Sequence, residues 1–128
     1  MKVTNKVLLD SVTSLRKLNG LELPIKVAFL IHKNITEVEK ELGNYTASRQ
    51  RLIDQYTEKD EKGQPKVDEF NNYQFKDDCI SKWQSDIAEL LEIETELKLQ
   101  PISISDLMDA HITITPSELA SIEFLFKE

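Results

Sequence analysis

An apolar seam through residues 24–56 constrains the fold more than any other feature of the chain. Its members recur at alternating spacings of three and four, which places them on one side of a helix. Sustained over about four heptads, such a seam is typical of a helix that packs along its length against another helix. Gly43 and Asn44 are weak helix formers inside it, so a kink is allowed there. The seam residues are Ala28, Ile31, Ile35, Val38, Leu42, Tyr45, Arg49, Leu52 and Tyr56.

A second seam in residues 76–92 supplies the partner helix, because its apolar residues repeat the same spacing. An antiparallel pairing of the two helices aligns Tyr56 with Lys76 and Arg49 with Trp83. The guanidinium group of Arg49 then stacks on the indole ring. We therefore expect an antiparallel helical hairpin over about 24–92. The second seam consists of Ile80, Trp83, Ile87 and Leu90.

The stretch between the seams, residues 57–75, is rich in charge and in turn-forming residues, and predicts an exposed loop with room for a short hairpin. Asp60, Glu61 and Gly63 invite comparison with a calcium loop, but the alternating oxygen ligands and terminal Glu of an EF-hand are missing. We find no internal repeat in the chain.

Residues 93–128 show a different period. Apolar residues alternate with polar ones over 93–99 and again over 111–115, which predicts two strands. Thr115, Pro116 and Glu118 then form the start signal of a short C-terminal helix. Residues 1–4 can add a strand, and a helix follows them to about Leu18. We expect one domain, 1–128, of the α+β class and mainly helical, with a small β-sheet beside the long hairpin.

Charge separates the two halves of the chain and excludes a general affinity for nucleic acid. The formal net charge is −7, with +3 in residues 1–57 and −10 in residues 58–128. Asp78, Glu89, Glu92 and Glu96 fall on the side of the second helix opposite Trp83. They are our candidate surface for a basic protein partner, the alternative being an ordinary solvated helix face.

No group of residues has the spacing of a catalytic, cofactor or metal site. His32 and His111 lie far apart, and Asp106 and Asp109 near His111 are read as polar turn residues rather than metal ligands. Cys79 flanks the second seam and is expected to be a buried apolar side chain. We expect no enzyme activity, no cofactor, no metal and no membrane-spanning segment.

Four segments together resemble a family of small uncharacterised proteins of tailed phages and prophages of Gram-positive bacteria. The order and spacing of these segments match across nearly the whole chain, and the family brings no catalytic residues to carry over. The segments are Leu23–Phe29, Tyr45–Ile53, Lys59–Gly63 and Pro101–Leu107.

The resemblance implies a phage protein acting in the cytoplasm of the infected bacterial host. We expect it to be a non-catalytic protein-binding factor, an accessory or assembly protein that contacts a phage structural protein through its helical hairpin. The alternative is an inhibitor of a host defence protein, such as a nuclease, that uses an acidic, nucleic-acid-like surface. The sequence leaves open the oligomeric state, and also whether the acidic surface or the loop 57–75 is the one that binds.

Overall fold

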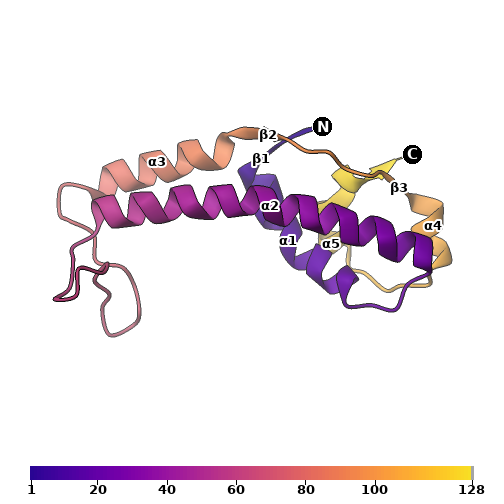
Figure 1. Ribbon diagram of the computed structural model, residues 1–128, viewed down its shortest axis with the longest axis horizontal. Coiled ribbons are helices and arrows are strands. Elements are labelled where there is room, and N and C mark those ends of the chain that lie inside the picture. The colour runs from indigo at the N-terminus through magenta and orange to yellow at the C-terminus, as the bar shows by residue number, and fades with distance from the viewer. Residues whose placement is uncertain (128) are drawn as a thin grey trace. The chain divides into compact units, whose positions relative to one another are not determined.

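The computed structural model describes residues 1–127 and is α+β, mainly helical, as the sequence predicts. The chain forms two compact units. The first unit consists of residues 1–42 and the chain from Glu94 onward, and the second of residues 43–93. The long helix α2, Ile25–Tyr56, contributes its first half to one unit and its second half to the other (Figure 1).

Helix α2 confirms the long seam. It is continuous through Gly43 and Asn44. The seam residues from Ile31 to Tyr45 are all buried, and Tyr56 is buried at the far end, while Arg49 and Leu52 are half-buried. The three-four spacing thus marks the face of α2 that packs inside each unit.

In the first unit, helix α1 (Asn5–Asn19) packs against the short helix α5 (Pro116–Ile122). The Thr4 hydroxyl caps α1 by accepting the Val7 amide at 3.2 Å. A polar contact joins the two helices within their interface: the hydroxyls of Ser14, which is buried, and Ser121 are 2.8 Å apart. The core of the unit consists of fully buried apolar side chains, among them Leu8, Leu15, Leu18, Ile102, Ile122 and Leu125.

Two small sheets complete the first unit. Strand β1 (Lys2–Thr4) pairs antiparallel with β2 (Glu94–Glu96), so the N-terminal strand joins the predicted one, which is shorter than 93–99. Strand β3 (Ile102–Ser103) pairs in parallel with β4 (Phe126–Lys127), a strand that the sequence did not indicate.

Side chains of α2 hold the extended segment 95–100 along the helix. Asn34 is fully buried; its amide group donates to the Gln100 carbonyl at 2.9 Å and its oxygen accepts the Gln100 amide at 2.8 Å. One turn further on, the Glu37 carboxylate accepts the Lys98 amide at 3.4 Å. These side chains supply hydrogen bonds to the backbone amides and carbonyls of the segment that a neighbouring strand would supply in a sheet.

The predicted strand 111–115 is wrong. Helix α4 (Ile104–Asp109) ends there, and the His111 amide bonds back to the Met108 carbonyl. His111 takes a left-handed conformation, with φ 54°, as residues after a helix end often do. The capping box of α5 is confirmed: Thr115 and Glu118 exchange side-chain and backbone hydrogen bonds.

In the second unit, α3 (Ile80–Glu92) lies beside the second half of α2 and forms the predicted antiparallel hairpin (Figure 1). The Lys76 amide donates to the Tyr56 carbonyl at 2.9 Å, which confirms the predicted alignment of these residues. Helix α3 begins four residues later than expected, because Lys76 and the turn that follows it belong to the connecting loop.

Residues 57–76 of the connecting loop are built on an eight-residue backbone repeat. Three backbone hydrogen bonds form a closed triangle: Glu58 donates to Gln74 at 2.9 Å, Gln74 to Lys66 at 2.9 Å, and Lys66 to Glu58 at 2.7 Å. Along the chain, Glu58, Lys66 and Gln74 follow one another at intervals of eight residues. The loop thus repeats one backbone pattern with different side chains.

Two of the three sides of the triangle, Glu58 to Lys66 and Lys66 to Gln74, are each spanned by a short hairpin. The first hairpin is closed by a bridge between Lys59 and Pro65, and the second by a bridge between Val67 and Tyr73. A third bridge joins Thr57 to Phe75, where the loop returns to the helices. The predicted loop is therefore exposed but regular.

Candidate functional site

The predicted partner-binding residues do not share one helix. Glu89 and Glu92 lie exposed on α3, and Asp78 precedes that helix. Glu96 lies in β2, in the first unit. Its carboxylate accepts the ammonium group of Met1 at 2.8 Å, and this bond lowers the pKa of Glu96. The expectation that one helix carries all four is wrong, because α3 ends at Glu92.

The predicted contact between Arg49 and Trp83 is confirmed. The Arg49 guanidinium carbon is 5.9 Å from the centre of the indole ring. Phe75, from the end of the connecting loop, also contacts Trp83, with ring centres 4.9 Å apart and planes tilted by 33°. A cation and an aromatic ring therefore fix the indole where the two helices and the loop meet.

A second bond between the helices ties Tyr56 to Asp86. The Tyr56 hydroxyl donates to the Asp86 carboxylate at 2.5 Å. This hydrogen bond is the main cause, and burial the second, of a pKa of Tyr56 that is raised above its ordinary value. Asp86 is thus engaged within the hairpin, while Asp77, Asp78, Glu89 and Glu92 are exposed. We call these four carboxylates, which lie on α3 or just before it alongside the exposed Lys76 and Lys82, the acidic surface.

The apolar face of α3 is incompletely covered. No residue of this helix is fully buried, although its apolar residues follow one stripe. Ile80 keeps 47% of its surface exposed, and Trp83, Ile87 and Leu90 are half-buried. A hairpin of two helices has only one packing layer, so its apolar residues stay within reach of a further surface.

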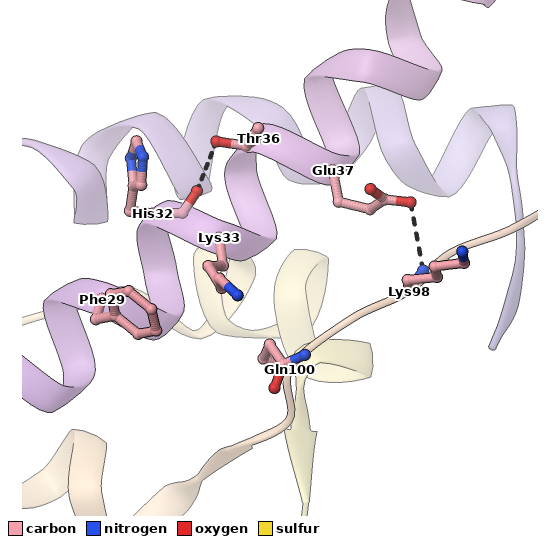
Figure 2. A pocket seen from close by; sticks show the side chains of 7 residues that line it. All are labelled: Phe29, His32, Lys33, Thr36, Glu37, Lys98 and Gln100. Atoms are coloured by element: carbon pink, nitrogen blue, oxygen red, sulfur yellow. Dashed lines mark hydrogen bonds between the residues drawn. The ribbon is translucent and has the colours of Figure 1, made fainter.

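A groove of about 440 Å³ opens on the first unit, between α2 and the extended segment beside it (Figure 2). The Lys33 ammonium lies 5.3 Å from the centre of the Phe29 ring. The Thr36 hydroxyl donates to the His32 carbonyl of its own helix at 2.9 Å. The groove residues are Phe29, His32, Lys33, Thr36, Glu37, Lys98 and Gln100.

The remaining sequence candidates have structural roles. The Asp106 carboxylate pairs with the Lys26 ammonium at 3.4 Å. The Asp60 carboxylate accepts the Lys62 and Gln64 amides and shapes a turn. Cys79 is buried, and this burial raises the pKa of its thiol. Across residues 1–127, no three His, Cys, Asp or Glu side chains converge as a metal site.

No helix in the described part of the chain is both long and apolar enough to span a membrane. Comparison with known proteins finds no match to a protein-family model, a curated protein or a solved structure. The resemblance to phage proteins therefore stays a prediction.

The regular backbone of the loop at the end of the hairpin was not predicted from the sequence. The sequence feature that indicates it is an Asp-Glu pair that occurs twice, at Asp60 and Asp68. Three residues after each Asp stands a residue suited to a turn, Gly63 or Asn71. Both of these last residues have positive φ, 78° and 64°. Such residues at equal spacing indicate two copies of one turn.

Proposed function

We propose that this chain is a non-catalytic, phage-encoded protein-binding factor that works as an accessory or assembly protein through its helical hairpin. The observation that carries the proposal is the single-layered hairpin of the second unit, whose apolar stripe on α3 stays partly exposed. Binding to a second protein would cover that stripe and gain the free energy of burying it.

The internal contacts of the hairpin support the same proposal. Arg49, Trp83 and Phe75 form one cluster, and Tyr56 is bonded to Asp86. A surface fixed in this way loses little conformational entropy on binding, which favours affinity.

The acidic surface near α3 favours a second candidate, inhibition of a host defence protein such as a nuclease. Asp77, Asp78, Glu89 and Glu92 are exposed and carry no positive partner within ion-pair distance among the described residues. Exposed carboxylates can occupy a basic channel that otherwise accepts phosphates.

Capture from infected cells tests the proposal. The tagged full chain should retain a specific protein that a tag alone does not, and the purified pair should bind in a calorimeter. A phage structural protein supports the assembly role, and a host nuclease supports the inhibitor role. Retention of nothing from infected or uninfected cells contradicts both.

Charge reversal then separates the two roles. The double variant Glu89→Lys, Glu92→Lys should weaken binding to a nuclease at least about tenfold and abolish its salt dependence. Lys40→Glu, an exposed charge change on α2 in the first unit, is the matched control. Indifference to both reversal and salt rules out the acidic surface as the contact.

A further inference from the structure

The two short hairpins of the connecting loop have one backbone design. Asp60 and Asp68 each accept the amides two and four residues further on, at 2.8 and 3.0 Å in the first hairpin and 2.9 Å for both bonds in the second. Gly63 and Asn71 take the left-handed conformation at the same place in each turn. The chain thus contains a matched pair of turns for comparing side chains.

The two hairpins differ in what they present. The first hairpin carries Lys59, Lys62 and Pro65 at the positions where the second carries Val67, Phe70 and Tyr73. These apolar residues are exposed, by 42% at Val67, 74% at Phe70 and 36% at Tyr73. Because the same turn forms with a lysine at position 62, an aromatic residue at position 70 is not required by the backbone.

Lys59, Val67 and Phe75 occupy equivalent positions, eight residues apart, and the first and last of them make contacts within the second unit. Lys59 donates through its ammonium group to the Asp54 carbonyl, at the C-terminal end of α2, where a cation is favourable. Phe75 contacts Trp83. Val67 is the third equivalent, and it remains more than one third exposed. Of the three apolar side chains of the second hairpin, Phe70 is therefore mostly exposed, whereas Val67 and Tyr73 are exposed in part.

Charge defines what this patch fits. Residues 67–73 include Asp68 and Glu69 and no Lys or Arg. The first hairpin, by contrast, balances its carboxylates with lysines. Exposed Lys66 precedes this hairpin, but the charges within the hairpin itself are all negative. An exposed aromatic ring beside such charges is complementary to a pocket that is apolar inside and basic at its rim.

We propose that the second hairpin is the anchor of the protein-binding surface, with Phe70 inserting into an apolar, basic-rimmed pocket of the partner protein. This inference rests on the proposed function. Aromatic residues at the centre of an interface carry a large share of its free energy, and a turn held at both ends presents Phe70 with little loss of entropy. Three side chains cover too little area for a whole interface, so the hairpin helices supply the remainder.

Site-specific photo-crosslinking tests the anchor. Benzoylphenylalanine is placed at position 70 or, as a matched control, at position 62 of the tagged full chain, which is irradiated in infected cells. We expect position 70 to crosslink to the same protein that the unmodified chain captures, and position 62 to give no such product.

Affinity with the purified partner gives the second readout. Phe70→Lys, which copies the first hairpin, should raise the Kd at least about thirtyfold. Lys62→Ala should leave the Kd unchanged. Unaltered circular dichroism and Trp83 fluorescence show that the Phe70→Lys chain is folded.

The outcomes distinguish this inference from the function on which it rests. Capture of a partner without a crosslink from position 70, or with full affinity in Phe70→Lys, overturns the anchor and leaves the protein-binding function standing. A crosslink from position 70 to a second copy of the chain also overturns it. Failure to capture any protein contradicts both the anchor role of Phe70 and the protein-binding function.

Discussion

Replacing Asn34 tests what holds the extended segment to α2 in the first unit. The side chain has no exposed surface, and it makes two hydrogen bonds to the backbone of one residue, Gln100, at 2.8 and 2.9 Å. Asn34→Ala removes both bonds and leaves the amide and carbonyl of Gln100 without their partner. We therefore expect a large effect from a small change in volume.

The magnitude follows from those two bonds. Each is worth about 1 kcal/mol net, and because Gln100 is itself exposed, water can replace part of what its amide and carbonyl lose. Alanine returns roughly 0.5 kcal/mol through its better helix propensity. We expect Asn34→Ala to lower the free energy of unfolding by about 1–3 kcal/mol, a sizeable part of the ~5–15 kcal/mol typical of a domain.

Urea denaturation followed by circular dichroism measures this loss. Hydrogen exchange of the Gln100 amide gives the local readout, because that amide should lose protection even where the rest of the unit keeps it. Lys40→Ala, an exposed change on the same helix, is the control and should change stability by less than about 0.5 kcal/mol.

Asn34→Asp adds a test by pH. An ionised aspartate accepts the Gln100 amide but cannot donate to the Gln100 carbonyl, whereas the protonated acid can. Burial and that bond favour the neutral form, so the pKa in the folded chain should lie above the unfolded value of about 3.9. Stability is then greatest below the unfolded pKa and falls as pH rises through the folded pKa.

Two results would refute the reasoning. One is a loss below about 0.5 kcal/mol in Asn34→Ala with the Gln100 amide still protected. The other is a deficit in Asn34→Asp that does not change with pH. Either would show that the paired bonds do not hold the segment.

Three further perturbations test other contacts. Arg49→Ala should cost about 1 kcal/mol in urea denaturation followed by Trp83 fluorescence, because packing and the cation–π contact are lost. The hydrogen bond from Lys17, together with those at Thr115, lowers the pKa of Glu118. The ionised Glu118 therefore contributes its full stabilisation above the unfolded pKa of about 4.3, and this contribution is lost as pH falls through the pKa of the folded chain. Glu118→Gln should therefore flatten the acid side of the stability curve. Gly63→Ala should cost about 1 kcal/mol, because φ is 78° there, and Gly63→Asn should cost less.

Each of these has a contrary outcome. An Arg49→Ala chain as stable as the parent would contradict the contact with Trp83. An acid limb that keeps its slope in Glu118→Gln would show that the bond to Lys17 is not formed in solution. Equal losses for Gly63→Ala and Gly63→Asn would argue against a left-handed residue in the first hairpin.

The sequence by itself determined the helical hairpin and its register. The three-four spacing on α2 and α3 is a local property of each helix, and antiparallel pairing through one loop leaves a single alignment that buries both seams. Arg49 was therefore predictably placed on Trp83, and Tyr56 beside Lys76. The capping box at Thr115 was equally readable, because its residues lie three apart.

Only the tertiary structure decided how the backbone of the segments outside the long helices is satisfied. Asn34 bonds to Gln100, a residue 66 positions away. Residues 111–115 alternate as a strand would, but no strand in the described part of the chain pairs with them, and His111 follows the end of a helix instead. Alternation of side chains signals a strand only where a partner exists for its hydrogen bonds.

The same reason explains the connecting loop and its candidate anchor. The corners of the triangle, Glu58, Lys66 and Gln74, share no side-chain chemistry, because they meet through backbone amides and carbonyls that every residue carries. Once those bonds place two turns in one geometry, the difference between Lys62 and Phe70 becomes visible. Local sequence sets which residues a turn tolerates, and long-range backbone bonding decides which of them face solvent.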